Sequence, residues 1–499
     1  MSLKYVSTRN RDISATASEA ILQGLASDGG LFVPTEIPRL DVSLDTLAGY
    51  SYQRVAFEVM KLFLTDFSDD ELMSCINAAY DKKFDTPAIA PLKKEAGVYY
   101  LELFHGATIA FKDMALSILP HLMTTAAKKN NVKEEIVILT ATSGDTGKAA
   151  LAGFADVPGT RIVVFYPKDG VSPIQERQMV TQKGGNTRVI AIRGNFDQAQ
   201  TGVKQIFGDD ALKDELKSRG YILSSANSIN IGRLVPQICY YVYAYTRLVA
   251  EKVITPGDTV DVTVPTGNFG NILACYYAKQ MGLPIGKLVC ASNENKVLYD
   301  FFGTGVYDKN REFVLTTSPS MDILISSNLE RLIYHITGDD DKKTAKFMEQ
   351  LSSTGKYEIT EEMRSHLTDF YGGFANENAT AEEISRVFHA SGYVIDTHTA
   401  VASAVSLKYR EGSSAKSPMI IASTASPYKF TRYVLEALAK SEDIGRLNDK
   451  SDLELTKKLE SISGVAIPNA VLELFDAPVL HDIVCDVDGM PDEVKEFLN

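Results

Sequence analysis

Between residues 134 and 293 the chain alternates between two patterns of apolar and polar positions. The first is a short run of apolar, often β-branched residues, which is typical of a strand buried on both faces. Such runs predict strands at residues 134–141, 160–167, 187–194, 221–227, 258–267 and 287–293. The second has the helical period and predicts helices at residues 148–155, 172–185, 195–217, 231–253 and 272–282. We expect Ser172 to cap the helix 172–185 and Gly184–Gly185 to end it.

This alternation of strand and helix predicts an α/β fold with parallel sheets that are covered by helices on both faces. Ligands bind such sheets at the carboxyl ends of the strands. Three turns rich in glycine or hydroxyl residues follow predicted strands, at residues 142–147, 265–271 and 423–427. We therefore expect the binding site where these three turns meet.

The pattern changes along the chain, and 499 residues are more than one hydrophobic core usually holds. We predict an N-terminal appended domain of helical and mixed structure (1–95), a smaller α/β domain (96–232), a larger α/β domain (233–430) and a C-terminal helical segment (431–499). The larger domain includes an elaboration with acidic helices at residues 303–390. Near the N-terminus we expect a helix that stops at Gly29–Gly30.

Composition narrows the class of protein. Hydrophobic content is 45% and charged content is 23%, as in an ordinary globular protein. The net charge of −13 argues against nucleic-acid binding. No apolar run is long enough to span a membrane, and the first residues show no hydrophobic signal core, so we expect a cytosolic protein without a membrane partner. The five dispersed cysteines suit reduced core thiols, and the seven histidines show no metal-ligand spacing, so we expect no metal.

Lys112 lies at the edge of a helical apolar stripe formed by residues 111, 114, 115, 118, 119 and 122. With Thr108 as the cap, the lysine falls in the first helical turn, where the helix dipole disfavours a cation. Partial burial would lower its pKa further, as in lysines that form Schiff bases. Taken alone, however, such a lysine is more often a surface residue whose stem lies along apolar neighbours.

Two of the turns can hold anions. Residues 265–271, PTGNFGN, leave Gly267 and Gly270 free for close approach of the backbone to a phosphate at a helix N-terminus. They match neither a P-loop nor a dinucleotide fingerprint. Residues 142–147, TSGDTG, offer N–H groups and hydroxyls that suit a carboxylate. For each turn, an ordinary capped strand–helix connection is an equally good interpretation.

Single residues add to the picture. Thr424 ends a predicted strand and can meet a ring nitrogen without protonating it, and Arg233 and Arg331 are candidates for a substrate anion. A lysine in an apolar pocket, a phosphate loop and a carboxylate loop together indicate a pyridoxal-phosphate enzyme that acts on an amino acid.

Several segments carry a resemblance to a known family. The segments are STRN…ILQGLASDGGLFVP, ELFHGATIAFKDMA, LTATSGDTG, NSINIGRL, PTGNFGN and SPSMDILISSNLERL. Almost from end to end the chain resembles threonine synthases, which are fold-type II pyridoxal-phosphate enzymes, and it is most similar to their long fungal and bacterial branch. The resemblance implies two parallel-rich α/β domains with the cofactor between them.

The resemblance also implies an activity: O-phospho-L-homoserine and water become L-threonine and phosphate, by γ-elimination and β-addition of water, as the last step of threonine biosynthesis. It places the Schiff base on Lys112, which would also be the catalytic base. The residues implied to bind the cofactor are Lys112, Gly267, Asn268, Phe269, Gly270, Asn271 and Thr424. The residues implied to bind the substrate are Thr142, Ser143, Gly144, Asp145, Thr146, Arg233, Ser318, Ser320, Asn328 and Arg331. The partner is a small molecule, and we expect a monomer or simple homodimer.

The chain departs from the family pattern at Ala107, where a proline is usual, and at Ser426 and Tyr428. These departures concern the geometry of the pocket and leave the reaction class unchanged. Two alternatives stay open: another fold-type II lyase, such as a serine or threonine dehydratase, and a non-catalytic relative that binds a phosphorylated metabolite. The NSIN and SPSMDI segments argue against the first and Lys112 against the second.

Overall fold

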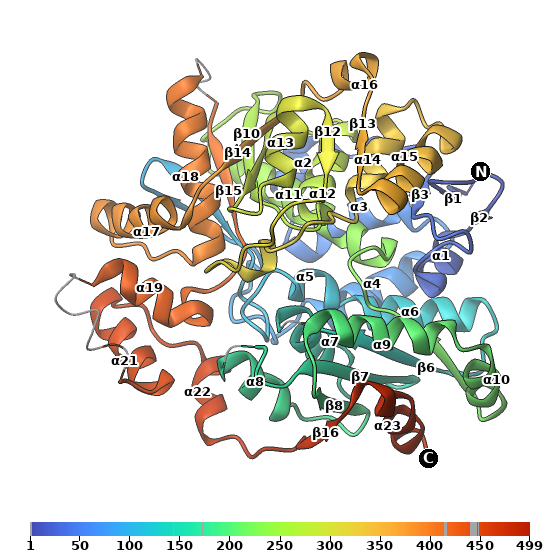
Figure 1. Cartoon of the computed structure of the whole chain (residues 1–499). Helices are drawn as coiled ribbons and strands as arrows, with labels where there is room; N and C mark the ends of the chain where they lie inside the picture. The colour runs from blue at the N-terminus through green and yellow to red at the C-terminus, as the bar shows by residue number, and fades with distance from the viewer. Residues whose placement is uncertain (1, 143, 172, 414–416, 440–446, 448) are drawn as a thin grey trace.

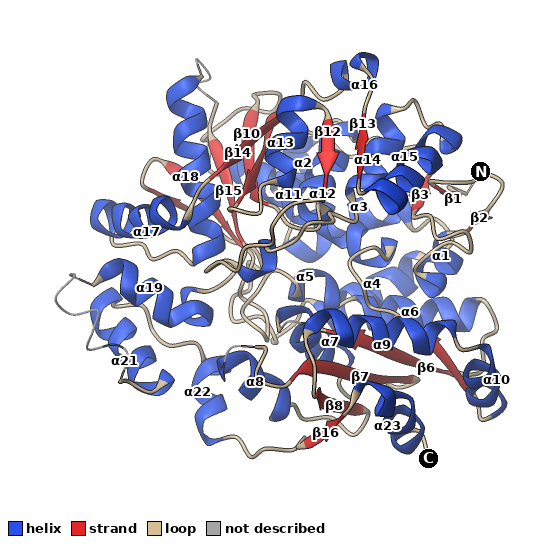
Figure 2. Cartoon of the chain, viewed as in Figure 1, coloured by secondary structure: helices blue, strands red, loops and turns tan. Residues whose placement is uncertain are grey.

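The computed structural model describes residues 2–142, 144–171, 173–413, 417–439, 447 and 449–499. Two separate sheets organise the fold (Figures 1 and 2). The larger sheet has the strand order β14 (Phe370–Phe374), β11 (Ile285–Ser292), β10 (Val260–Pro265), β15 (Met419–Ser423), β5 (Val98–Glu102) and β4 (Leu92–Glu95). Its neighbouring strands are parallel except for β4 and β5.

The smaller sheet is parallel throughout. Its strand order is β16 (Ile483–Cys485), β8 (Thr187–Ile192), β7 (Thr160–Pro167), β6 (Glu135–Ala141) and β9 (Tyr221–Ser224). The predicted class, a fold-type II α/β architecture with parallel-rich sheets, is therefore confirmed.

Strand β6 shows why these apolar runs form buried strands. Ile136 and Ile138 point into the large core shared by both halves of the molecule. Val137 and Leu139 point to the opposite face, into a core that includes Ala199, Val203 and Met490. Successive side chains of a strand point to opposite faces, so an uninterrupted apolar run is needed when both faces are covered.

The helices between these strands were predicted with two errors. They are α7 (Asp145–Phe154), α8 (Pro173–Val180), α9 (Phe196–Gly208), α10 (Asp210–Ser218), α11 (Ile231–Ala250) and α12 (Gly270–Gln280). The single helix expected at 195–217 is wrong, because Asp209 is extended and caps α10 by accepting a hydrogen bond from the Leu212 N–H at 3.0 Å. Helix α8 ends before the expected glycine stop, and its expected cap Ser172 lies outside the described residues.

The N-terminal region combines a small antiparallel sheet with helices. Its elements are β1 (Tyr5–Ser7), β2 (Ser14–Ala15), β3 (Phe32–Pro34), α1 (Ala17–Gln23), α2 (Leu44–Ala48), α3 (Tyr52–Phe63) and α4 (Asp69–Ala79). A capping box of Thr16 and Glu19 starts α1. The helix stops at Gly24, which has a φ of 69°, and not at Gly29–Gly30 as predicted.

Helix α11 joins this region to the larger sheet. It is buried along nearly its whole length and packs on α2, α3 and α12. The predicted long helix at 231–253 is thus confirmed as a central element of the core. Helices α5 (Asp113–Leu116) and α6 (Leu119–Lys129) lie between α11 and α7, in the region between the two sheets (Figure 1).

The remaining elements lie in residues 297–412, which extend beyond the predicted elaboration at 303–390 on both sides, and in the tail. Those of residues 297–412 are α13 (Val297–Thr304), β12 (Val306–Asp308), α14 (Leu329–Ile336), α15 (Asp341–Thr354), β13 (Lys356–Glu358), α16 (Glu361–Ser365), α17 (Glu377–Ser391) and α18 (Thr397–Gly412). Those of the tail are α19 (Thr431–Leu438), α21 (Asp452–Ser463), α22 (Asn469–Asp476) and α23 (Met490–Phe497), together with β16.

Strand pairing crosses two of the expected domain limits. Strands β4 and β5 lie on either side of residue 95, yet both belong to the larger sheet. The tail expected to be helical supplies β16, which pairs with β8 at the edge of the smaller sheet. The expected division of the chain stays a prediction, and sheet membership does not follow it.

Helices α5 and α7 approach closely at Gly153. A Cβ atom there would lie 2.1 Å from the Leu116 carbonyl oxygen. We therefore expect Gly153→Ala to lower the free energy of unfolding by about 1–3 kcal/mol. Urea titration followed by circular dichroism measures this. Gly303→Ala is the matched control, because Gly303 in α13 has no atom within 4 Å of an added Cβ and alanine stabilises a helix. Equal stability of the two variants would contradict this packing.

His105 follows β5 and lies between two carboxylates, with Nδ1 2.5 Å from Asp85 Oδ1 and Nε2 2.9 Å from Glu102 Oε2. Burial lowers the pKa of the imidazole, but hydrogen bonds to both carboxylates outweigh this and raise it to about 9. Because this pKa lies above that of an unfolded histidine, the stabilisation is complete below about pH 6.5 and disappears as the pH rises through 9.

We expect this pH dependence to be worth about 1–2 kcal/mol, since solvent around Asp85 screens part of the attraction. Urea unfolding at pH 6 and pH 9.5 measures the difference, and His105→Gln should reduce it by that amount. The exposed His389 provides the control variant His389→Gln, which should leave it unchanged. An unchanged pH dependence in His105→Gln would show that the ion pairs contribute nothing.

Candidate active site

A short antiparallel contact fixes the backbone before Lys112. The N–H of Phe111 donates to the carbonyl of Thr424 at 2.8 Å, and the N–H of Ser426 donates to the carbonyl of Ile109 at 3.0 Å. Ala110 and Ala425 form the bridge between them. Two of the expected site residues, Lys112 and Thr424, are therefore brought together at the carboxyl end of β15.

Asp113 clamps the same loop from the other side. Its carboxylate accepts hydrogen bonds from the Thr108 N–H at 2.8 Å and from the Thr108 hydroxyl at 2.7 Å. The expectation that Thr108 caps the helix is wrong: α5 begins at Asp113, Lys112 occupies the cap position, and the aspartate holds the threonine. The loop also needs a glycine at 106, because a Cβ there would lie 2.5 Å from the Asp113 Cβ.

Lys112 is a buried lysine and not a surface one. Its side chain is 11% exposed, and Nζ lies 3.2 Å from Ser320 Oγ and 3.5 Å from Asp145 Oδ2. Burial lowers the pKa of the ammonium, and the positive charges of Lys429 and Arg233 lower it further, against the opposing effect of Asp145. The reactive amine that the sequence pattern allowed is therefore favoured by its surroundings.

Asp145 is the anionic centre of the site. Besides Lys112, its carboxylate meets Lys429 Nζ at 3.1 Å and accepts hydrogen bonds from Gln175 at 2.9 Å and from the Ser320 hydroxyl at 3.3 Å. Burial alone would raise the pKa of this carboxyl, but the charges of Lys429 and Lys112 hold it well below its usual range. Asp145 is therefore ionised and bonded to the protein itself.

The turn after β10, where the sequence predicts a phosphate loop, joins that strand to α12. Phe269 takes a left-handed conformation with φ 62°, and α12 begins at the next residue. Gly267 packs against residue 320, since an added Cβ would lie 2.5 Å from the Ser320 carbonyl oxygen. The carbonyl of Asn268 accepts hydrogen bonds from the N–H and side chain of Asn328, at 3.1 and 3.0 Å. These contacts leave the N–H groups of the first turn of α12 without partners inside the helix.

Two buried donors on the packed helices α11 and α12 lack partners among the described residues: Arg233 Nε and Asn271 Nδ2. Asn271 Oδ1 accepts hydrogen bonds from the hydroxyls of Tyr240 and Tyr241, and Arg233 Nη1 donates to the carbonyl of Ala226 at 2.9 Å. Burial lowers the pKa of Arg233 to about 10. A buried donor without a partner is costly, so each of the two donors favours an acceptor on a bound ligand.

The turn at 142–147 is partly occupied by its own side chain. Thr142 Oγ1 accepts hydrogen bonds from the N–H groups of Gly144 and Gly147, both at 2.9 Å. The capped turn that the sequence left open is therefore present. Gly144 has φ 134°, and an added Cβ would lie 2.4 Å from Gln175. Thr146 is half-buried, and Ser143 lies outside the described residues.

Arg331 and its neighbours support the loops. Arg331 is fully buried and donates to the carbonyls of Phe32 and Ile229, at 2.9 and 2.6 Å, and to the side chain of Asn328. Asn328 in turn holds the turn after β10 through the carbonyl of Asn268. Ser318 is fully buried and accepts a hydrogen bond from Asn293 at 3.0 Å. Of the four residues expected in this region, Ser320 alone contacts Lys112.

Sequence reasoning missed two residues that hold this site. The Ser320 N–H donates to His398 Nε2 at 3.1 Å, and Nδ1 of that ring pairs with Asp396 at 2.9 Å. Lys429 was missed as well, although it lies two residues after the predicted turn 423–427. Its position in the sequence was the available signal.

Of the unusual residues, Ser426 caps the turn that contains Lys429, and Tyr428 donates to the carbonyl of Val465.

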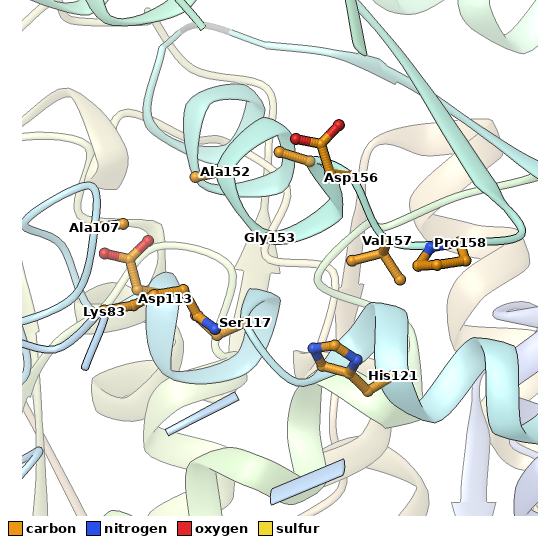
Figure 3. A pocket seen from close by; sticks show the side chains of 11 residues that line it. Lys83, Ala107, Asp113, Ser117, His121, Ala152, Gly153, Asp156, Val157 and Pro158 are labelled. Carbon is orange, nitrogen blue, oxygen red and sulfur yellow. The ribbon is translucent and has the colours of Figure 1, made fainter. Parts of the chain in front are cut away.

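A cavity of about 250 Å³ lies behind the lysine loop (Figure 3). Ala107, Asp113, Ser117 and His121 form one wall, and residues 152, 153 and 155–158 form the other. The unusual Ala107 thus borders this cavity.

No group of metal-ligating side chains and no helix capable of crossing a membrane occurs within the described ranges.

Comparison with known proteins gives the family. Family models match residues 4–80 (threonine synthase N terminus), 83–424 (pyridoxal-phosphate dependent enzyme) and 399–467 (threonine synthase, C-terminal). The chain is 37% identical to threonine synthase of Pseudomonas aeruginosa, over 87% of this chain and 90% of that protein. It is 40% identical to human threonine synthase-like 1, over 88% of this chain, and spans 59% of that protein's length.

A solved structure agrees with these matches. The crystal structure of pyridoxal-phosphate-bound threonine synthase from Brucella melitensis superposes with a TM-score of 0.87 at 35% identity, covering 100% of this chain and 99% of that one. The family models, the sequence relatives and the solved structure thus all point to one family. The chain belongs to the threonine synthase family of pyridoxal-phosphate-dependent enzymes.

Proposed function

We propose that the protein is a threonine synthase that converts O-phospho-L-homoserine and water to L-threonine and phosphate. One observation carries this proposal: Ser320 lies between a buried lysine with a lowered pKa and a glycine-containing turn, and Asn271 of that turn has a buried amide without a partner. That combination suits an aldehyde that bears a phosphate group, and the family membership supplies the reaction class.

The residues present fit pyridoxal phosphate. We propose that Lys112 binds its aldehyde, that residues 267–271 with the N-terminus of α12 hold its phosphate, and that Thr424 meets its ring nitrogen. The unpartnered Asn271 amide at the N-terminus of α12 supports the phosphate position. When bound, the cofactor supplies an electron-withdrawing ring that stabilises negative charge at the substrate's α carbon.

The chain's own residues then bind the substrate and move protons. Arg233, with its free Nε, is suited to the substrate phosphate, and its charge would stabilise that group as it leaves. Thr146 and the N-terminus of α7 are suited to the substrate carboxylate. Lys112 Nζ would take a proton from the α carbon and later from the β carbon, a task that its lowered pKa favours. In this proposal Ser318, Asn328 and Arg331 act by holding the loops.

We further propose that the enzyme works in the cytosol as a monomer or simple homodimer. All five cysteines are free and buried, which suits a reducing compartment. A dehydratase of the same fold type, or a non-catalytic relative that binds a phosphorylated metabolite, remains the competing function, and the experiments below separate these from a threonine synthase.

The first experiment tests Lys112. Wild-type protein incubated with pyridoxal phosphate should absorb visible light and release phosphate from O-phospho-L-homoserine. In Lys112→Ala we expect the lysine-dependent absorbance to vanish and phosphate release to fall by about 10²–10⁴-fold, since both the attachment point and the base are lost. The exposed Lys128 on α6 gives the control Lys128→Ala, which should match the wild type.

Two outcomes would contradict the proposal. Ketoacid formation from serine or threonine without phosphate release from O-phospho-L-homoserine would indicate a dehydratase. A wild-type protein that stays colourless with pyridoxal phosphate would indicate the non-catalytic relative.

The second experiment tests Arg233. In Arg233→Met we expect KM for O-phospho-L-homoserine to rise about 10- to 100-fold, because a charged hydrogen bond to the substrate phosphate is lost, while the visible absorbance stays. Arg331→Met is the comparison: its three hydrogen bonds go to protein acceptors, so we expect a lower melting temperature. An unchanged KM in Arg233→Met would assign the substrate phosphate to other residues.

A further inference from the structure

Lys429 is a fully buried cation at the centre of the site. Its side chain is 0% exposed. Nζ lies 3.1 Å from Asp145 Oδ1 and donates a hydrogen bond to the Thr108 carbonyl at 3.0 Å. Lys429 therefore joins the N-terminus of α7 and the loop that carries Lys112 to the turn that follows β15.

Lys429 and Lys112 share one carboxylate. Lys429 meets Oδ1 of Asp145, and Lys112 lies 3.5 Å from Oδ2. A single negative charge is thus divided between two lysines in a buried place. Since opposite charges favour the ionised form of a lysine and like charges disfavour it, the charge of Lys429 affects the protonation of Lys112.

Besides Asp145 and Lys429, four other charged or titratable groups lie around Lys112. Asp113 lies on its own helix α5, Lys148 and Arg233 lie on α7 and α11, which pack on α5, and His398 on α18 reaches the site through Ser320. Asp113 is committed to Thr108, and Lys148 donates to Gln182 at 2.6 Å. His398 is paired with Asp396 and accepts from the Ser320 backbone. Arg233 adds a second positive charge.

We propose that Lys429 is a positioning residue that neutralises Asp145 and anchors the Thr108 carbonyl, so that Lys112 is held in place as a neutral, reactive amine. The proposal rests on the proposed function in so far as Lys112 is the lysine that binds the cofactor. It goes further, because it holds that a second lysine, Lys429, sets the protonation and position of Lys112 without touching the reacting atoms.

The direction of the effect follows from the charges. Without Lys429, Asp145 faces Lys112 alone, and the repulsion between the two ammonium groups disappears. Both changes raise the pKa of Lys112, so less neutral amine is present at a given pH. Removal of the Asp145 charge does the opposite, because Lys112 then feels Lys429 without compensation. A merely structural role would not move Lys112 in opposite directions in the two variants.

Pulse labelling with acetic anhydride in cofactor-free protein measures the Lys112 amine directly. Mass spectrometry of the Lys112 peptide gives the labelling rate as a function of pH. In Lys429→Met we expect the midpoint to rise by about one pH unit, so that the rate at a pH below the midpoint falls about tenfold. In Asp145→Asn we expect the midpoint to fall, and in the double variant it should lie between the two.

Two further variants act as controls. Lys429→Arg keeps the charge and should keep the wild-type midpoint. Lys148→Met removes another mostly buried positive charge but no contact of Asp145, and should leave the midpoint in place. Melting curves show which variants are folded, and if Lys429→Met is not, Lys429→Gln takes its place, because it removes the charge but keeps a donor for the Thr108 carbonyl.

An unchanged midpoint in Lys429→Met or in Asp145→Asn would overturn the proposal, as would shifts of both in the same direction. This result is separate from the fate of the proposed function. A wild-type protein that gains no visible absorbance with pyridoxal phosphate fails the proposed function, whereas the labelling curves of cofactor-free protein still test Lys429.

Discussion

The site depends on a single stretch of backbone pairing, in which residues 109–111 lie antiparallel to residues 424–426. These hydrogen bonds tie the loop that carries Lys112 to the end of a central strand of the larger sheet. Asp113 then closes the loop on itself through Thr108. With its backbone held at both places, a lysine can be kept in a buried position that its charge opposes. Asp145, Ser320 and the turn after β10 are arranged around that fixed point.

Local sequence pattern predicted most of the fold and failed where a distant contact decides. The strands β6 to β11 and β15 were predicted because burial on two faces requires uninterrupted apolar residues, as in β6, whereas β4, β5 and β14 of the larger sheet were not predicted. The break between α9 and α10 was missed because the apolar period continues through Asp209, while the extended backbone there ends one helix and caps the next. The edge strand β16 was missed because three residues carry too little pattern.

Prediction of the site residues succeeded and failed for the same reasons. Lys112, the two turns and Thr424 were found because each follows a recognisable strand or helix pattern. Lys429 and His398 were missed because their importance lies in contacts with Asp145 and Ser320, far away in sequence. Arg331 was expected to bind an anion. Its buried guanidinium donates to the carbonyls of Phe32 and Ile229 and so supports the fold, which the local sequence pattern does not indicate.

The three-residue strand β16 determines how the smaller sheet ends. Without it, β8 would present a row of unpaired N–H and carbonyl groups, which is a template for pairing with another chain. With it, the edge is too short to extend, and Asp482 and Asp486 flank it with negative charge. The last residues of the chain thus protect the smaller sheet against edge-to-edge aggregation, a property of solubility and not of catalysis.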